Sequence, residues 1–263
     1  MPLIFAHPAA VIPLAKPLGR HASLSALVIG SMCPDFPYLL PLGVVRMHTH
    51  DPLALLWFCL PVGLVAYGLF HVLLAPVCAR LLPRQIASRL PPASFLGRLP
   101  KSNLVAVLLC LMTGAFSHLL VDSATHRDGH IVALLPFLQL YVGQFAGSKF
   151  YVFKILQHVL GIIGIGMIAI WIKDWMRRTP PSSNADSFRL PRAVRIAGLC
   201  LLIAVPIGAG IIGGIHGWPP PHRTLKTHVR ARSFLMVGGS TFFAGWMVMG
   251  LLVRRSRPDS DSE

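Results

Sequence analysis

The chain has 263 residues, 54% of them hydrophobic, and a formal net charge of +15. Its mean hydropathy of +0.64 excludes an ordinary soluble domain, because several apolar runs approach the roughly 20 residues that span a bilayer. The basic residues are grouped between apolar runs, and no basic stretch is interleaved with aromatic residues, so we expect no nucleic-acid partner.

The amino-terminal segment, residues 1–21, is punctuated by Pro8, Pro13 and Pro17. These prolines forbid a long regular helix, so the segment is expected to be an irregular lead-in. No basic region precedes its apolar stretch, so we do not expect a cleaved signal peptide, and His7 should remain in the mature protein.

An acidic residue interrupts the next apolar run. Residues 22–33 predict a helix that stops at Pro34, because a proline disfavours helical backbone angles at the residue before it, here Cys33. Asp35 then follows a helix end. Inside a membrane such an acid is a candidate functional residue, and the alternative is an interfacial aspartate in a turn.

Residues 46–52, RMHTHDP, place His48, His50 and Asp51 just before the strongest apolar run. Two residues of spacing put both imidazoles on one side of an extended segment, but on different sides of a helix. We therefore expect only one of them to be a ligand, and the spacing does not decide which.

Five runs are long enough to cross a bilayer: 52–76, 103–121, 153–172, 194–216 and 234–253. A sixth, 22–45, is interrupted by Pro34, Asp35 and Pro37. The sequence predicts an all-α, polytopic membrane bundle of five to six spans. We divide it into a membrane domain, residues 1–175, and a two-helix extension, 176–263, with basic loops and a short tail.

Basic residues predict the orientation of the spans. Loops 77–101 and 173–193 and the tail are rich in arginine and lysine, which assigns them to the cytoplasm and loop 122–152 to the outside. Loop 217–233 conflicts, because it is expected outside but is also basic. In this topology His118, Asp122, His126 and His158 fall at the outer face, together with His48, His50, Asp51, Asp128 and His130.

The most informative motif is 114–130, GAFSHLLVDSATHRDGH, at the end of a span. His118, Asp122 and His126 are four residues apart and share one helical stripe, and imidazole and carboxylate groups at this spacing can hold a metal ion. His118 and His126 would lie about 12 Å apart on a straight helix. Either the helix ends near Ser123, or Asp122 bridges two ions.

The order of these motifs resembles a bacterial family of membrane proteins, domain of unknown function 4184. The matching stretches are His7-Pro8, LSALVIGSMCPDF (24–36), MHTHDPL (47–53), SHLLVDSATHRDG (117–129) and KILQH (154–158). More distantly, the order is similar to that of inner-membrane metal-dependent hydrolases, which are related in turn to the zinc-dependent phospholipase C fold. That fold holds clustered zinc ions in an all-helical site.

The resemblance covers residues 1–175 at least and implies a set of ligands. The hydrolase pattern falls on His7, Asp35, His50, His118 and Asp122. His126 and His158 match only the closer family, so we rank them below the first five. The resemblance also implies the inner (plasma) membrane of a bacterium, and the topology predicted from the basic loops puts the site on its periplasmic or outer side.

Imidazole and carboxylate ligands without cysteine favour one to three divalent ions, with zinc preferred and manganese or iron as alternatives. We expect metal-activated water to hydrolyse an ester, a phosphoester or lipid head group, with Asp35 and Asp122 as catalytic residues. Membrane lipids would be partners and the source of substrate. The alternatives are a metal or proton transporter and a non-enzymatic membrane scaffold.

Overall fold

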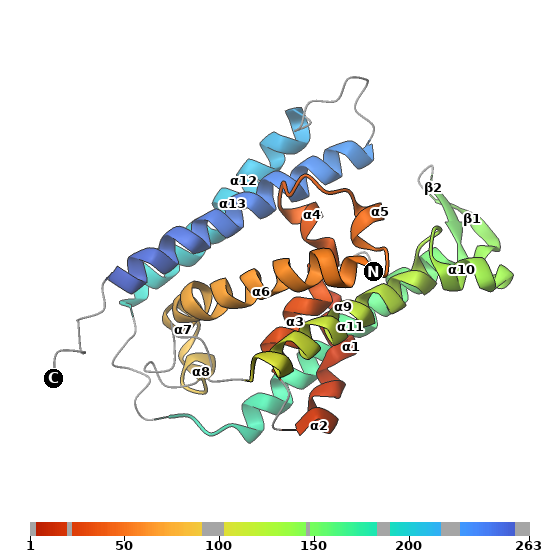
Figure 1. Cartoon of the computed structure of the whole chain (residues 1–263). Coiled ribbons are helices and arrows are strands. Elements are labelled where there is room, and N and C mark those ends of the chain that lie inside the picture. The colour runs from red at the N-terminus through yellow and green to blue at the C-terminus, as the bar shows by residue number, and fades with distance from the viewer. Residues whose placement is uncertain are drawn as a thin grey trace. The chain divides into compact units, whose positions relative to one another are not determined.

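The computed structural model describes residues 4–19, 23–90, 103–145, 148–182, 190–216 and 227–255 (Figure 1). The predicted tail, Arg98 and Lys101 of loop 77–101, and residues 217–226 of loop 217–233 lie outside the described residues. The chain forms two compact units. Unit 1 comprises Met1–Asp35, Val45–Tyr67 and Ser102–Trp175, and unit 2 comprises Phe36–Val44, Gly68–Lys101 and Met176–Glu263.

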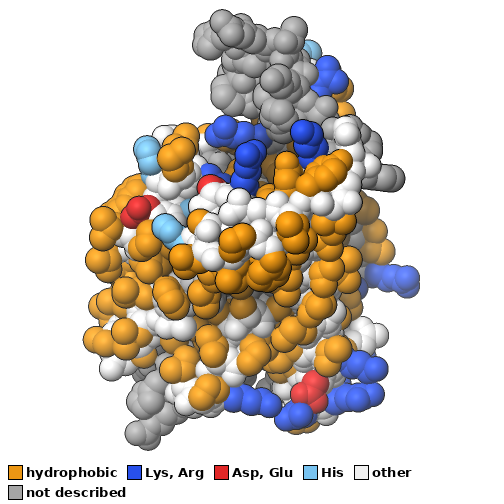
Figure 2. Space-filling view, turned by 90° about the vertical axis from the view of Figure 1, so that its right-hand side faces the viewer, with side chains coloured by type: hydrophobic (Ala, Val, Ile, Leu, Met, Phe, Trp, Pro, Cys, Tyr) orange, Lys and Arg blue, Asp and Glu red, His pale blue; other side chains and the backbone are white. Residues whose placement is uncertain are grey.

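The predicted polytopic all-α architecture is confirmed. Five helices of the described residues are long and apolar enough to cross a membrane: Leu55–Leu81, Leu104–Leu134, Val152–Arg178, Arg192–His216 and Arg230–Val253. Their large apolar side chains face outward; Ile162, for example, is 73% exposed. Figure 2 shows such side chains in orange over much of one face, as expected of a lipid-facing surface.

The sixth apolar run is not one continuous helix. Helix α3 (Leu24–Met32) is followed by a 3-10 turn, η4 (Cys33–Asp35), and by the short helix α4 (Phe36–Leu39). The expectation that Pro34 forces Cys33 out of helical angles is wrong, because Cys33 has φ −56° and ψ −42°. The chain accommodates its prolines by tightening into the 3-10 turn.

The amino-terminal segment is helical, which corrects the expectation of an irregular lead-in. It consists of η1 (Ile4–Ala6), α1 (Pro8–Val11), η2 (Ile12–Leu14) and α2 (Ala15–Leu18). Pro8 and Pro13 lie in the first turn of α1 and η2, where the amide hydrogen that proline lacks has no partner within the helix.

In unit 1, α3 packs very closely against α9 (Leu104–Thr125). A Cβ atom at Gly30 would overlap the Leu111 carbonyl group, and one at Gly114 would overlap the Leu27 carbonyl oxygen. The contacts Ser23–Cys110, Leu27–Gly114 and Ser31–His118 advance in the same direction along both helices, so the helices run parallel. Their carboxyl ends, which carry Asp35 and Asp122, therefore lie at the same level.

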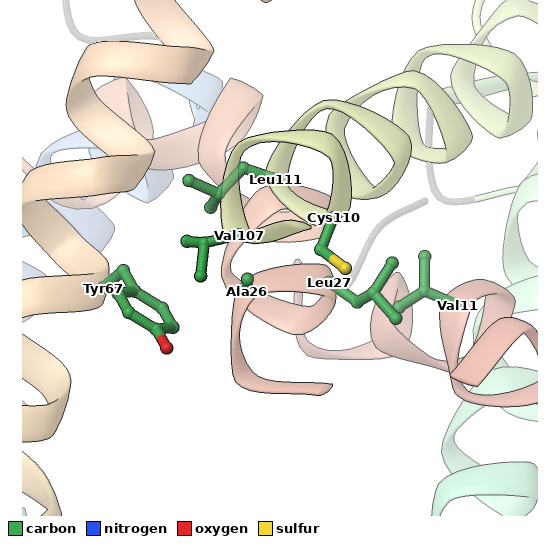
Figure 3. Packing of buried hydrophobic residues seen from close by; sticks show 7 residues of the cluster. All are labelled: Val11, Ala26, Leu27, Tyr67, Val107, Cys110 and Leu111. Atoms are coloured by element: carbon green, nitrogen blue, oxygen red, sulfur yellow. The ribbon is translucent and has the colours of Figure 1, made fainter. Parts of the chain in front are cut away.

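Apolar residues fill the space around this contact (Figure 3). The buried cluster draws on α1, α3, α9 and α6 (Leu60–Leu69), and consists of Val11, Ala26, Leu27, Tyr67, Val107, Cys110 and Leu111. The α6 helix belongs to a continuous run that begins with a π-helical turn, η5 (Leu55–Cys59). That turn precedes Pro61, which the run tolerates without a break.

The rest of unit 1 follows the end of α9. It contains α10 (His130–Leu134), the 3-10 turn η8 (Pro136–Gln139), an antiparallel hairpin and α11 (Val152–Arg178). The hairpin strands, β1 (Tyr141–Phe145) and β2 (Ser148–Tyr151), lie in the segment that the sequence predicts only as an external loop. Gly164 brings α11 against Ala6 and Ala9.

Unit 2 contains the π-helical turn η6 (Phe70–Leu74), α4, α7 (Ala75–Leu81), α8 (Arg84–Ala87), α12 (Arg192–His216) and α13 (Thr227–Arg255). Gly210 contacts Phe234 and Gly213 contacts Val237, so the glycines of α12 serve close helix packing. Because α13 begins at Thr227, the end of the predicted loop 217–233 is helical.

Candidate metal centre

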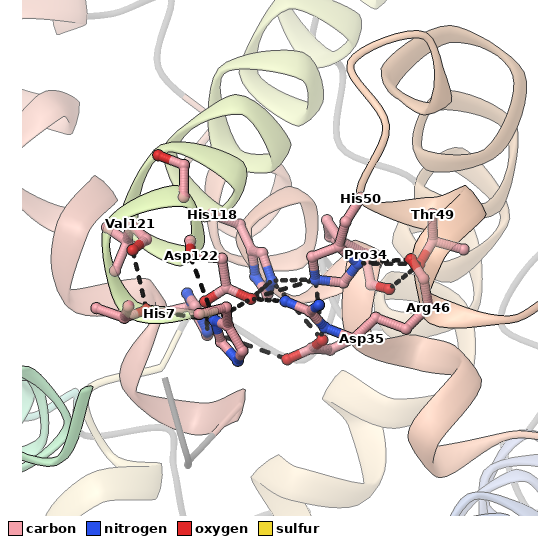
Figure 4. A network of polar contacts seen from close by, with 12 residues as sticks. His7, Pro34, Asp35, Arg46, Thr49, His50, His118, Val121 and Asp122 are labelled. Carbon is pink, nitrogen blue, oxygen red and sulfur yellow. Dashed lines mark hydrogen bonds and ion pairs between the residues drawn. The ribbon is translucent and has the colours of Figure 1, made fainter. Parts of the chain in front are cut away.

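Five polar side chains of unit 1 converge where α3 and α9 end (Figure 4). Successive turns of α9 supply His118 and Asp122, and η4 supplies Asp35. His50 caps the carboxyl end of α5 (Arg46–Thr49), and His7 stands at the start of α1. All five belong to the predicted ligand set.

Four ligand atoms form the inner set: Asp35 Oδ1, His50 Nε2, His118 Nε2 and Asp122 Oδ2. The His50 and His118 nitrogens are 3.2 Å apart. His50 Nε2 lies 3.4 Å from the Asp35 oxygen and 3.3 Å from the Asp122 oxygen. For His118 Nε2 the corresponding distances are 3.7 and 3.5 Å.

These distances match the edges of a coordination tetrahedron. Zinc binds imidazole nitrogen and carboxylate oxygen at about 2.0–2.1 Å, so adjacent ligand atoms of a tetrahedral site lie about 3.3–3.4 Å apart. The five distances of the inner set bracket that value. All four atoms lie within 4.8 Å of one another, so the residues fit a single divalent ion.

The protonation of the two imidazoles follows from their other nitrogens. His118 Nδ1 lies 2.7 Å from the Ser31 carbonyl oxygen and must donate to it, since a carbonyl only accepts. His50 Nδ1 lies 3.1 Å from the Arg46 carbonyl oxygen and donates in the same way. In the neutral form of each ring, Nε2 therefore presents a lone pair to the inner set.

A cation is needed at this point, because two lone pairs and two carboxylates face one another. A proton on His50 is one solution. Burial alone would lower the pKa of His50, but hydrogen bonds to the Asp122 and Asp35 carboxylates raise it above its usual value. Burial would raise the pKa of Asp35, yet the His50 hydrogen bond and the charge of His118 hold it below its usual value. A divalent metal ion is the other solution.

His7 stands behind the inner set and is 1% exposed. Its ring stacks on that of His118, with centroids 3.7 Å apart, and neither of its nitrogens has a hydrogen-bond partner. Burial, followed by the charge of His118, lowers its pKa to about 2. Its Nε2 lies 3.8 Å from Asp122 Oδ1 and 4.0 Å from Asp35 Oδ2, too far for hydrogen bonds.

Arg46 contributes a permanent positive charge to the rim of the cluster. Its guanidinium group lies 3.0 Å from Asp122 Oδ2 and 3.0 Å from Asp128 Oδ2. Its side chain is 20% exposed, whereas that of Asp128 is 68% exposed. The cluster therefore opens toward solvent on the arginine side and is closed on the His7 side.

Two neighbours fix the segment that carries His50. The Thr49 hydroxyl group is buried and donates to the Pro34 carbonyl oxygen at 2.9 Å, which ties α5 to the turn that holds Asp35. Asp51 is exposed and accepts from the Leu53 amide at 2.8 Å, at the start of the helix that follows.

The lower-ranked histidines are placed differently. His126 caps α9, which runs unbroken past Ser123, and its Nδ1 lies 3.4 Å from Asp122 Oδ2. Its Nε2 accepts from the Gln157 amide at 2.9 Å, so His126 borders the inner set without joining it. His158 is exposed, with Nδ1 on the Lys154 carbonyl oxygen. His48 and His130 are also exposed.

Sequence reasoning missed three contributors to the cluster. Arg46 and His50 are four residues apart, so their proximity is detectable once a helix over 46–49 is assumed. The buried Thr49 hydroxyl and the Ser31 carbonyl oxygen leave no such signal. Their contacts depend on how α5 and α3 meet other segments.

Comparison with known proteins identifies the family of the chain but no individual relative. No curated protein and no solved structure is significantly similar to it. One family model matches residues 1–251, almost the whole chain, and the resemblance in motif order points to the same family. The chain belongs to the family described as Domain of unknown function (DUF4184).

Proposed function

We propose that this protein is a membrane-embedded, metal-dependent hydrolase that acts on an ester, a phosphoester or lipid head group in particular. The observation that carries the proposal is the inner set of Asp35, His50, His118 and Asp122. Its two imidazole nitrogens lie 3.2–3.7 Å from each other and from both carboxylate oxygens. Zinc is the preferred ion, with manganese or iron(II) as alternatives, because the donors are imidazole and carboxylate without thiolate.

The chemistry is divided between the ion and the chain. A bound divalent ion would supply Lewis-acid chemistry, lowering the pKa of water and polarising a phosphoryl oxygen. His118 and His50 hold their lone pairs in place through their Nδ1 hydrogen bonds. Asp35 and Asp122 carry the ligand charge, and we assign proton acceptance to Asp35, whose Oδ2 lies outside the inner set.

Arg46 supports a phosphoester over an uncharged ester. A guanidinium group at the exposed rim suits an anionic phosphoryl group, because its donors match two oxygens at once. Lipid head groups are the nearest phosphoesters to a protein with five apolar, span-length helices.

An outer-face site is part of the proposal. Two of the helices that begin near the cluster end in basic residues, Arg80 on Leu55–Leu81 and Arg177 and Arg178 on Val152–Arg178. The positive-inside rule then assigns the cluster to the periplasmic or outer side. In a background without native cysteines, Asp128→Cys should react with an impermeant maleimide in intact bacteria, and Arg178→Cys only after lysis. The reverse pattern would refute the orientation.

Transport of a metal ion or proton is the competing function. It requires polar groups across the membrane, but the buried residues of α9 upstream of His118 are Val107, Cys110, Leu111, Gly114 and Ala115. Because these buried residues are apolar, α9 offers no polar pathway through the membrane, which favours a site that opens to one face only. Metal uptake into proteoliposomes by the wild-type protein, lost in His118→Ala, would support transport instead.

The decisive experiment compares metal content and hydrolysis in the same detergent-purified protein. Wild type should bind a divalent ion near-stoichiometrically and cleave aryl phosphodiesters or phospholipid vesicles. His118→Ala and Asp122→Ala should lose the ion and at least about 100-fold in rate. His48→Ala, which removes an exposed histidine, is the matched control. Folded wild type that resists metal loading would refute the proposal.

A further inference from the structure

In each of the two aspartates of the cluster, one carboxylate oxygen faces the inner set and the other faces His7. Asp35 turns Oδ1 toward His50 and His118, and Asp122 turns Oδ2 toward the same pair. The remaining oxygens, Asp35 Oδ2 and Asp122 Oδ1, are the ones nearest His7 Nε2, at 4.0 and 3.8 Å. Both carboxylates therefore lie between the inner set and His7.

His7 has no other partner that explains its burial. It is 1% exposed and both ring nitrogens lack hydrogen bonds, although buried polar atoms normally have them. Its Nε2 is too far from either oxygen for a hydrogen bond but is positioned to share an ion with both. The distances of 3.8 and 4.0 Å need to shorten by only about 0.5 Å to become ligand–ligand edges.

From these contacts we propose a second cation site, formed by His7 Nε2, Asp35 Oδ2 and Asp122 Oδ1, with both aspartates bridging it to the inner set. The site takes a divalent transition-metal ion, because its donors are one imidazole and two carboxylates. This inference rests on the metal-binding part of the proposed function and makes the centre dinuclear. In a dinuclear centre Asp35 is a bridging ligand, and the role of proton acceptor assigned to its Oδ2 applies only to the singly loaded protein.

His126 is the other residue expected to hold a second ion, through Asp122. Its nitrogens are engaged: Nε2 accepts from the Gln157 amide at 2.9 Å, and Nδ1 lies 3.3 Å from the Asp122 carbonyl oxygen. Those of His7 have no hydrogen bonds. The contrast assigns the second position to the buried side of the cluster.

The charge balance sets a condition on the second ion. The two carboxylates neutralise one dication, so a second ion also needs an added anionic ligand such as hydroxide, while the bridging oxygens reduce the repulsion between the two dications. The guanidinium of Arg46 lies 3.0 Å from Asp122 Oδ2, the oxygen that belongs to the inner set.

Metal stoichiometry tests the inference without reference to activity. Full-length protein in detergent is stripped with a chelator, reloaded with manganese(II) or zinc, and freed of excess ion by gel filtration. Wild type should retain two ions per chain and His7→Phe one. Phenylalanine keeps the stacking on His118 while removing both nitrogens, so the variant should fold. His158→Phe makes the same change at an exposed histidine and should retain two.

Electron paramagnetic resonance of the manganese-loaded protein gives a second readout. Two ions that share carboxylate bridges should give a broad, exchange-coupled signal, and His7→Phe should give the six-line signal of an isolated ion. Should His7→Phe fold poorly, wild type loaded with one equivalent should show six lines that lose intensity when the second equivalent is added.

The outcomes separate the two proposals. One ion in both wild type and His7→Phe would overturn the second site and leave the hydrolase proposal standing. Two ions in both would overturn the assignment to His7. Wild type that binds no ion would overturn the second site together with the proposed function.

Discussion

His118 Nδ1 lies 2.7 Å from the Ser31 carbonyl oxygen, so the carboxyl end of α3 sets the orientation of a ring carried by α9. A backbone acceptor on a metal-binding histidine fixes both its tautomer and its direction. The bond is buried and joins helices whose spacing is set by Gly30 and Gly114. Helix packing and site geometry are therefore coupled in this protein.

Gly114→Ala should consequently weaken both stability and metal binding. The new methyl group would overlap the Leu27 carbonyl oxygen, which is backbone and cannot move aside, so α3 and α9 must separate. We expect a loss of about 1–3 kcal/mol in unfolding free energy, seen as a lower Tm in detergent. Metal affinity should fall because Ser31 moves away from His118.

The control for this change is Gly166→Ala. Gly166 is also in a span-length helix, but a Cβ atom there meets nothing within 4 Å. Its Tm should be unchanged or slightly higher, since alanine favours the helix by about 0.5–1 kcal/mol. Equal effects of the two substitutions would mean that the close approach of α3 and α9 is unimportant.

Arg46→Gln should have opposite effects on metal and on anions. The guanidinium lies 3.0 Å from Asp122 Oδ2, where it would compete with a bound dication for the same oxygen. Removing this charge should raise metal affinity about tenfold, and weaken inhibition by inorganic phosphate by a similar factor. Isothermal titration of the metal and phosphate inhibition of hydrolysis measure the two effects.

Arg127→Gln is the matched control, because it makes the same substitution at an exposed arginine between His126 and Asp128. It should change neither quantity by more than about twofold. Arg46→Lys should keep the metal affinity close to wild type and still weaken phosphate binding, since lysine lacks the planar fork. Parallel changes in metal and phosphate binding in Arg46→Gln would contradict the assignment.

His126→Asn should weaken metal binding without abolishing it. His126 lies 3.4 Å from Asp122 Oδ2 and is held by Gln157, so it orients a ligand instead of providing one. Loss of such a contact lowers metal affinity about 10- to 100-fold. Competition with a fluorescent zinc chelator measures this range. Complete loss, equal to that of Asp122→Ala, would mean that His126 is itself a ligand.

Metal-free and metal-loaded protein should respond to pH in opposite directions. The pKa of His50 is raised above its unfolded value, so its contribution to stability is full below pH 6.5 and is lost as pH rises through the folded pKa. Metal binding requires neutral imidazoles and strengthens over the same range. Between pH 6 and 7.5 the Tm in chelator should fall while the increase in Tm produced by zinc grows.

Below this range His7 has the opposite effect. Its pKa is lowered to about 2, so at pH values below 6.5 His7 is protonated in the unfolded chain but remains neutral in the folded chain. Stability of the metal-free protein should therefore fall below pH 6.5, by up to about 1.4 kcal/mol per pH unit. A zinc-induced increase in Tm that is independent of pH would show that protons and metal do not compete in the cluster.

The sequence predicted the spans and the main members of the cluster because both leave local signals. The length of an apolar run identifies a membrane span, and the four-residue spacing of His118 and Asp122 puts them on one side of a helix. Asp35 could be selected because an acid stands out in an apolar run. The hairpin of 141–151 was missed because it is short and follows no apolar period.

The geometry of the cluster could not be predicted in the same way. The division of the Asp35 and Asp122 oxygens between His7 and the inner set depends on the parallel packing of α3 and α9, which in turn depends on two glycines. His158 was predicted at the same membrane level as His126, yet on α11 its side chain is exposed and bonds to the Lys154 carbonyl oxygen. Facing the same membrane level does not determine which side of a helix a residue occupies.

The cluster also has an order of assembly. His7, Asp35 and His50 precede α9 in the chain, so they are synthesised and inserted before His118 and Asp122 exist to meet them. Until α9 is in place, Asp35 lacks the His118 ring, one of the groups that lower its pKa in the folded protein. Arrival of α9 completes the set, so newly made protein should resist proteolysis only once this helix is in place.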